Sequence, residues 1–149
     1  MFPKLVTLAV IGLMLMVVPP ALTLRYTVHN TKVIFFEALH QCIKNGGYLA
    51  AVETPYQAEQ IWTAIKNSGA STSQVWWVSG TDLGIEGSWL WLSRNKAVGT
   101  IRGWTNWMDG EPNNSNNVEH CMSLNGSKNG QWNDISCEAT QFYVCEYTY

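Results

Sequence analysis

The sequence has 149 residues, with nine basic and eleven acidic side chains and a formal net charge of −2. This length allows one domain, and the mildly acidic balance argues against nucleic acid as a partner, because nucleic-acid-binding surfaces are basic. Tryptophan occurs eight times, which predicts a core built around large aromatic rings.

The N-terminus has the three-part pattern of a secretory signal peptide. A short start containing Lys4 precedes an unbroken apolar run over residues 5–18, and a breaker with small residues, PPALT, follows it. The run is shorter than the roughly 20 residues that a membrane-spanning helix needs, and no later segment of the sequence is suited to span a bilayer. We therefore predict a signal peptide over residues 1–23 and a secreted, extracellular domain over residues 24–149. A membrane anchor is the alternative.

The first half of this domain predicts two helices. Apolar residues recur at helical spacing from Ile34 to Ile43, and Gly46-Gly47 ends the run. YLAAV (48–52) then reads as a short strand. TPYQ (54–57) predicts a second helix start, with a capping threonine, proline at the first helical position and glutamine closing a capping box. The buried stripe of this helix is predicted at Ile61, Trp62 and Ile65.

The second half has strand character, with one long interruption. VWWVSG (75–80) and WLWLS (89–93) are β-rich, as are three short segments after residue 118. Nothing regular is predicted from Arg94 to Val118, and a loop of this length is usually functional or disordered. Trp104 and Trp107 lie within it as apolar anchors, which predicts an ordered loop. The fold class is therefore α+β.

The domain contains an even number of cysteines: Cys42, Cys121, Cys137 and Cys145. In an oxidising compartment this indicates two disulfides, and three pairings are open. No CxxC or HxxxH spacing supports the alternative of a zinc site. A nested pairing, Cys42–Cys145 with Cys121–Cys137, would tie the last residues of the chain to the first helix.

Oxygen-bearing side chains gather at the end of the long loop and just after it. GEPNNSNNVEHC (110–121) and WND (132–134) contribute three carboxylates and two amides, and a Cys121–Cys137 bond would bring the two stretches together. Hard oxygen ligands without thiolate or imidazole favour Ca²⁺ over zinc or copper, because calcium takes six to eight oxygens. The sequence has no EF-hand spacing. The predicted site is therefore made by the fold, from Glu111, Asn113, Glu119, Asn133 and Asp134.

Several motifs occur together over residues 26–147: EALHQC (37–42), EGSWLW (86–91), EPN (111–113), Glu119 shortly before Cys121, WND before Cys137, and Cys145 near the end. This combination resembles the C-type lectin domain family, in its short two-disulfide form. The resemblance implies a C-type lectin-like double-loop fold with two helices, small antiparallel sheets and a long ordered calcium-binding loop. It also implies the nested disulfides and a cis peptide bond before Pro112.

The resemblance implies carbohydrate binding as well. In the family, the calcium shell keeps two positions open for vicinal sugar hydroxyls. Each hydroxyl would donate its proton to Glu111 or Glu119 and accept from the amide of Asn113 or Asn133. The acid-then-amide order of EPN is similar to mannose-type members, whereas galactose-type members carry QPD. The expected ligands are therefore terminal mannose, fucose or N-acetylglucosamine.

An auxiliary calcium site is implied less completely. Asp82 and Glu86 match two of its ligands, but Asn114 and His120 stand where the family has carboxylates. If a second Ca²⁺ binds, Asp82 and Glu86 hold it weakly; the alternative is that they are ordinary loop acids. His120 is interpreted as a surface or supporting residue rather than as a metal ligand.

The predicted function is that of a binding protein and not of an enzyme. No GxSxG or HExxH motif is present, and acids that alternate with amides fit ion chelation better than a glycosidase acid pair. The resemblance, which extends to secreted single-domain invertebrate lectins, predicts a Ca²⁺-dependent lectin in innate immune recognition of microbial or glycoprotein glycans. Avidity would require a homodimer or a lectin partner. The alternative is a calcium-independent, protein-binding domain of the same fold.

The sequence also contains a predicted site of glycosylation. Asn125 lies in a glycosylation sequon, Asn-Gly-Ser.

Overall fold

The computed structural model describes residues 23–149, and the predicted signal peptide lies outside them except for Thr23. Within this range no helix has the length and apolar character needed to cross a membrane. The helices and strands follow one another as β1 (Leu24–Val33), α1 (Phe35–Lys44), β2 (Tyr48–Leu49), α2 (Pro55–Asn67), β3 (Val75–Thr81), β4 (Leu90–Trp91), β5 (Lys96–Ala97), the 3₁₀ turn η1 (Ser115–Asn117), β6 (Cys121–Asn125), the 3₁₀ turn η2 (Gly126–Lys128), β7 (Gln131–Ile135) and β8 (Gln141–Thr148). The predicted α+β class is confirmed.

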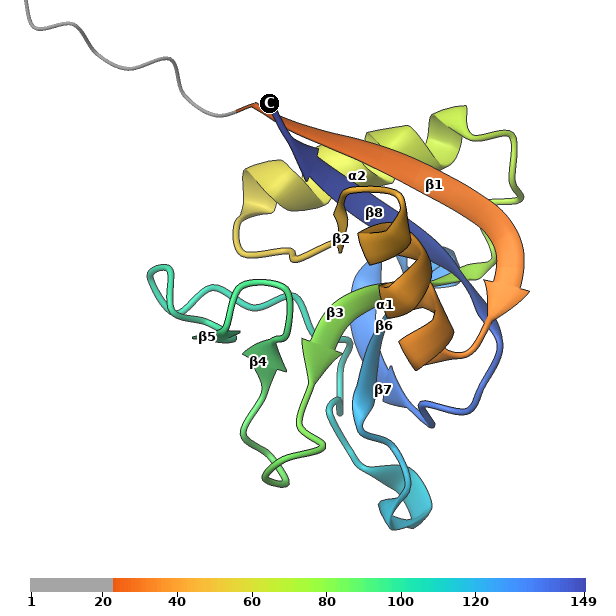
Figure 1. The fold of residues 1–149 in the computed structure, drawn as a ribbon. Coiled ribbons are helices and arrows are strands. Elements are labelled where there is room, and N and C mark those ends of the chain that lie inside the picture. Colours follow the sequence, from red (N-terminus) through yellow and green to blue (C-terminus); the bar gives the residue numbers. More distant parts are fainter. Residues whose placement is uncertain (1–22) are drawn as a thin grey trace, which may run out of the picture.

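One twisted sheet organises the domain (Figure 1). Its order is β1-β8-β3-β4-β5, and β6 pairs with both β3 and β7. Leu24 lies opposite Thr148, so the start and the end of the domain meet on neighbouring strands. Strand β1 has no counterpart among the predicted elements. It is an edge strand whose residues are half-exposed or exposed except for Val33, and its first six residues, LRYTVH, do alternate apolar and polar side chains, so a strand signal was present in the sequence.

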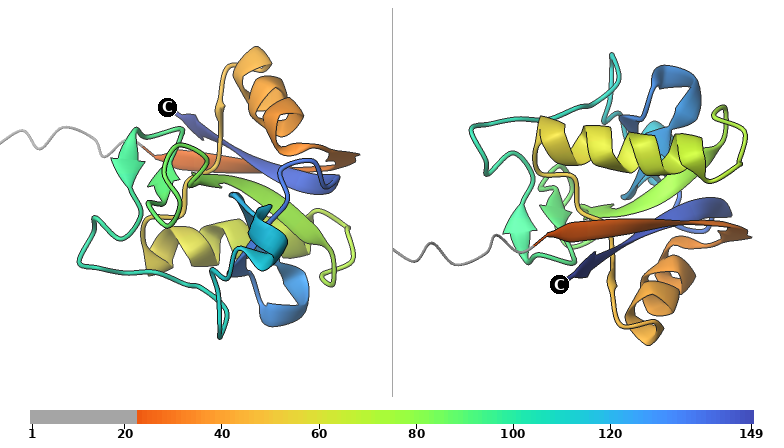
Figure 2. Two further views of the ribbon diagram at one scale, coloured as in Figure 1. Left: turned by 90° about the horizontal axis from the view of Figure 1, so that it is seen from below. Right: turned by 90° about the horizontal axis from the view of Figure 1, so that it is seen from above.

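The two predicted helices are confirmed, and they cover opposite faces of the sheet (Figure 2). Helix α1 buries Phe35, Ala38 and Cys42 on one face, where the Phe35 ring meets Trp77 edge to face at 5.6 Å. Helix α2 buries Ile61 and Ile65 on the other face. Each face therefore has its own apolar core.

The start of α2 differs from the predicted capping box in one detail. Thr54 Oγ1 accepts a hydrogen bond from the backbone N–H of Gln57 at 3.2 Å, as a capping threonine should. The Gln57 side chain, however, accepts from the N–H of Glu53 at 2.7 Å instead of from Thr54. The Trp62 side chain, predicted in the buried stripe, is only partly buried. YLAAV is also shorter as a strand than predicted, since only Tyr48 and Leu49 pair with β8.

The long segment from Arg94 to Val118 contains two short regular pieces, β5 and η1, that were not predicted. Its order comes from Trp132, whose ring lies 5.3 Å from that of Trp104 and 5.6 Å from that of Trp107, both edge to face. The backbone is fixed beside it, because the N–H of Met108 donates to the carbonyl of Trp132 at 2.9 Å. This anchor holds the chain directly before EPN and therefore positions the predicted site.

Candidate functional site

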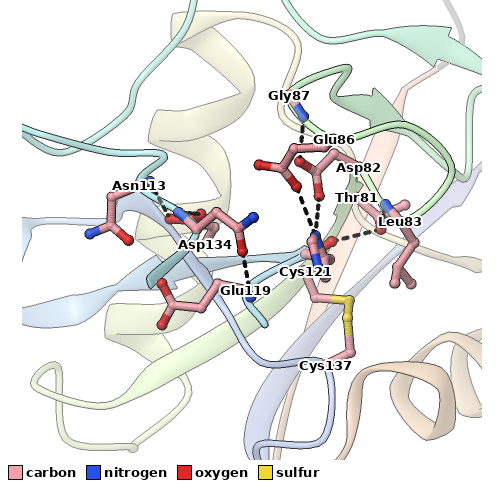
Figure 3. Close-up of polar contacts among 12 residues, drawn as sticks. Thr81, Asp82, Leu83, Glu86, Gly87, Asn113, Glu119, Cys121, Asp134 and Cys137 are labelled. Atoms are coloured by element: carbon pink, nitrogen blue, oxygen red, sulfur yellow. Dashed lines mark hydrogen bonds and ion pairs between the residues drawn. A yellow bond between two sulfur atoms is a disulfide. The ribbon is translucent and has the colours of Figure 1, made fainter. Parts of the chain in front are cut away.

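Two disulfides fix the framework of the site. Cys42 is bonded to Cys145 and Cys121 to Cys137, and no cysteine among residues 23–149 is left free. The nested pairing is confirmed. Because Cys121 begins β6 and β6 pairs with β7, the chain before Cys121 and the WND motif meet at the same end of the sheet. Figure 3 shows the polar side chains that gather beside this disulfide.

Asp134 anchors the EPN loop to β7. Its carboxylate is fully buried and accepts hydrogen bonds from the backbone N–H groups of Asn113 at 3.2 Å and Asn114 at 2.7 Å. A buried carboxylate requires such partners. The loop is therefore held with its side chains next to WND, as the oxygen-rich pattern predicted.

The other loop residues are joined by a short chain of hydrogen bonds. Asn113 Nδ2 donates to Glu111 Oε1 at 3.0 Å, and the backbone N–H of Ser115 donates to Glu119 Oε2 at 3.0 Å. The N–H of Glu119 in turn donates to Asn114 Oδ1 at 3.1 Å. The Glu111–Pro112 peptide bond is cis, as the resemblance implied. We call Glu111, Asn113, Glu119, Asn133 and Asp134 the oxygen group.

The oxygen group crowds acceptors together. Burial raises the pKa of Glu111 to about 7, with further contributions from a hydrogen bond to Asp134 and from the negative charges of Asp134 and Glu119. The Asn133 amide lies against the Glu111 carboxylate, and in the orientation that satisfies both groups its nitrogen donates to the two carboxylate oxygens at 3.2 and 3.3 Å.

A second set of side chains lies on the other side of Glu119. Asp82, Glu86 and His120 offer ligand atoms that all lie within 4.8 Å of one another. His120 Nδ1 is 3.0 Å from Asp82 Oδ1 and 3.3 Å from Glu86 Oε2. Figure 3 shows the two carboxylates, Asp82 and Glu86, next to each other. We call these three residues the histidine group. Asn114, which the resemblance placed at the auxiliary site, bonds to Glu119 instead.

His120 lies where the resemblance implied, beside Asp82 and Glu86. The sequence did not indicate that its Nδ1 would contact both carboxylates directly. The available signal was its position directly before Cys121, where a strand begins. Asn125 lies at the opposite end of β6 and is half-buried, and its glycosylation stays a prediction.

Comparisons with known proteins agree with this architecture. The family model described as "Lectin C-type domain" matches residues 31–147. The chain is 33% identical over 114 residues to a perlucin-like protein of Mytilus galloprovincialis, covering 73% of this chain and 67% of that protein. It is 31% identical over 128 residues to salivary C-type lectin 1 of Aedes albopictus, covering 82% and 81%. The chain spans only 33% and 43% of the length of two further curated relatives.

Two solved structures show how widely this fold is used. The C-type lectin CEL-I from Cucumaria echinata has a TM-score of 0.74 at 24% identity, over 87% of this chain and 96% of that one. A calcium-independent type II antifreeze protein has a TM-score of 0.66 at 22% identity, over 89% and 95%. At these identities the likeness concerns the fold alone, so function has to be argued from the site residues.

Proposed function

The chain belongs to the C-type lectin domain family, and from this premise we propose that it binds terminal mannose-type sugars in a Ca²⁺-dependent manner through the oxygen group. C-type lectin domains are carbohydrate-binding modules, so the family places the chain among binding proteins and not among enzymes. The finer assignment, to calcium and to mannose, fucose or N-acetylglucosamine, rests on the side chains of this site.

The observation that carries the proposal is the convergence of oxygens around Glu111. Glu111 accepts a hydrogen bond from the Asn113 amide at 3.0 Å and lies against the Asn133 amide. Its pKa is raised to about 7 by burial, by a hydrogen bond to Asp134 and by the negative charges of Asp134 and Glu119, although the oxygens of these three carboxylates do not all lie within 4.8 Å of one another. Carboxylates of like charge oppose one another unless a cation or a proton lies between them. The donor set, oxygens alone and several carboxylates, is the one that Ca²⁺ prefers. The residues therefore fit calcium.

The same residues suit two neighbouring hydroxyls of a sugar. Bound Ca²⁺ would accept one lone pair from each hydroxyl. Glu111 and Glu119 can only accept hydrogen bonds, whereas the Asn113 and Asn133 amides can donate them. Acids that alternate with amides therefore satisfy a hydroxyl as donor and as acceptor at once. The EPN order of acid and amide is the basis for proposing mannose-type instead of galactose-type ligands.

We further propose that the protein is secreted and recognises glycans on microbial or glycoprotein surfaces. The predicted signal peptide and the two disulfides both suit an oxidising, extracellular setting. A site with so few contacts to each sugar binds weakly, so useful avidity requires several sites in one assembly. A homodimer or a lectin partner would supply them.

Retention on immobilised mannose tests the proposal. We expect the protein to be retained in Ca²⁺ and released by EDTA, with N-acetylglucosamine competing for the site. Retention that EDTA does not alter would overturn the calcium mechanism. The absence of retention on any glycan of an array in Ca²⁺ would favour the calcium-independent, protein-binding alternative.

The sugar preference has its own test in the paired variant Glu111→Gln with Asn113→Asp. This exchange reverses the order of acid and amide while keeping the size and number of oxygen ligands. We expect retention to shift from mannose-agarose to galactose-agarose. Unchanged mannose retention in the variant would show that the order of acid and amide does not select the sugar.

A further inference from the structure

We infer that the histidine group, Asp82, Glu86 and His120, binds a divalent transition metal, represented by Zn²⁺, and that it is not an auxiliary calcium site. The inference does not depend on sugar binding or on the oxygen group. It starts from the three ligand atoms that lie within 4.8 Å of one another at the end of β3 and the start of β6.

The kinds of donor decide which ion fits. Calcium requires six to eight oxygens, and this group offers two carboxylates and one nitrogen. Imidazole nitrogen suits zinc and its neighbours among the transition metals. Open zinc sites combine three protein ligands, such as His₃ or His₂Glu, with a water; this group has the same number of ligands, with one histidine and two carboxylates. The nitrogen donor and the small ligand number therefore both argue against calcium.

The distances are compatible with such an ion. Zinc bonds of about 2.0–2.2 Å in a tetrahedral shell place neighbouring ligand atoms roughly 3.3–3.6 Å apart. His120 Nδ1 lies 3.0 Å from Asp82 Oδ1 and 3.3 Å from Glu86 Oε2. Small side-chain movements would admit a metal among these atoms without a change in the backbone.

The backbone already holds two of the three ligands in place. Thr81 is paired with Cys121 between β3 and β6. The carbonyl of His120 accepts from Thr81 Oγ1 at 2.7 Å and from the N–H of Asp82 at 3.3 Å. Cys121 is in turn tied to Cys137 by a disulfide. His120 and Asp82 therefore face each other across a strand pair that a disulfide reinforces.

Asp82 is oriented further by its second oxygen. Its side chain is only 2% exposed, and Oδ2 accepts from the N–H of Gly87 at 2.8 Å, which leaves Oδ1 directed at His120. Partners that fix the orientation of a ligand in this way strengthen metal binding. The Glu86 side chain, 57% exposed, closes the group from the solvent side, so an ion and its water ligand have access.

The alternative is that the group is a plain ion pair, with a protonated His120 between two carboxylates. A metal site binds Zn²⁺ saturably, whereas a plain ion pair does not.

The experiment is a Zn²⁺ titration. We would strip the protein with EDTA, dialyse it into buffer with saturating Ca²⁺ to fill the oxygen group, and titrate it with ZnCl₂ by calorimetry. Co²⁺ serves as the optical stand-in, since its visible absorption is strong in a four-coordinate protein site and weak for the hydrated ion. We expect one Zn²⁺ per chain and a visible Co²⁺ band that Zn²⁺ abolishes. The absence of saturable Zn²⁺ binding would overturn the inference.

Matched variants identify the ligands. His120→Asn should weaken Zn²⁺ binding by more than the 10–100-fold typical of losing a supporting partner. Glu86→Gln should also weaken Zn²⁺ binding, and the protein should stay folded because the Glu86 side chain is mostly exposed. His40→Asn removes an exposed imidazole on α1 and should leave binding unchanged. His120→Asp exchanges nitrogen for oxygen and should lose the preference for Zn²⁺. Equal Zn²⁺ affinity in wild type and His120→Asn would show that the ion binds elsewhere.

Discussion

The oxygen group and the histidine group meet in the sequence at two consecutive residues: Glu119 belongs to the oxygen group and His120 to the histidine group. Each group has a buried carboxylate that accepts backbone N–H donors: Asp134 receives two of them and Asp82 receives one. The other members differ. Acids and amides complete the oxygen group, whereas one acid and an imidazole complete the histidine group. If the two proposals hold, similar anchoring with different donor atoms means that donor type, and not local negative charge, decides which ion each group takes.

The two disulfides offer the sharpest way to separate the stability of the fold from the geometry of the sites. In the chain-entropy model, a closed loop of about 100 residues contributes about 4.7 kcal/mol and one of about 15 residues about 3 kcal/mol. Cys42 and Cys145 are 103 residues apart, and Cys121 and Cys137 are 16 apart. Replacing the first pair by serine should therefore cost more stability in urea unfolding.

The effect on ion binding should run in the opposite order. Cys121 follows His120 directly, so loss of the Cys121–Cys137 bond should weaken Ca²⁺ and Zn²⁺ binding together, as measured by calorimetry. Loss of the Cys42–Cys145 bond should leave both affinities close to wild type in the fraction that stays folded. If both pairs lowered the ion affinities equally, the sites would depend on global stability instead of on local geometry.

Asp134→Asn should affect only one of the two groups. The substitution keeps the shape of the side chain but removes its charge and one of the two acceptors that hold the N–H groups of Asn113 and Asn114. We expect Ca²⁺ affinity to fall at least on the order of 100-fold, beyond the usual loss for a supporting residue, with mannose retention lost. Zn²⁺ affinity should not change.

A control of the same chemistry is available two residues before Glu111. Asp109 is exposed, so Asp109→Asn removes one charge from the same loop without removing a ligand. It should leave Ca²⁺ affinity and mannose retention unchanged. An equal loss in both variants would mean that the net charge of the loop, and not the individual ligand, attracts the ion.

The pH dependence of calcium binding should follow Glu111. Without metal, the pKa of its carboxyl is about 7, so below that pH a proton must leave before the carboxylate can bind Ca²⁺. Affinity should fall with decreasing pH, approaching tenfold per unit for one displaced proton, and should level off above about pH 7. Calorimetry in buffers of different ionisation enthalpy would count the protons released. Constant affinity from about pH 5 to pH 8 would show that Ca²⁺ displaces no proton from a Glu111 carboxyl with a pKa of about 7.

The sequence predicted those parts of the molecule whose signals are local. Thr54-Pro55 marks a helix start by capping chemistry alone, and the motif resemblance selected one of three disulfide pairings and the cis bond before Pro112. Strand β1 was missed although its first six residues, LRYTVH, alternate apolar and polar side chains, so this miss was an oversight and not a lack of signal. The resemblance placed His120 near Asp82 and Glu86, but its direct contacts depend on the pairing of Thr81 with Cys121, forty residues apart in the chain, which local patterns do not show.

Thr54→Ala is expected to have the smallest effect, and it serves as a reference for the others. Thr54 caps α2 by accepting the N–H of Gln57 at 3.2 Å, and loss of such a cap costs about 1 kcal/mol of stability. This helix covers one face of the sheet, and none of its residues belongs to either group. The midpoint of urea unfolding should therefore fall while the Ca²⁺ and Zn²⁺ affinities stay at wild-type values. If a loss of about 1 kcal/mol at this cap lowered the Ca²⁺ or the Zn²⁺ affinity, the affected group would be sensitive to the general stability of the domain. The losses of affinity expected from Asp134→Asn and from the Cys121–Cys137 variant would then no longer report on donor geometry.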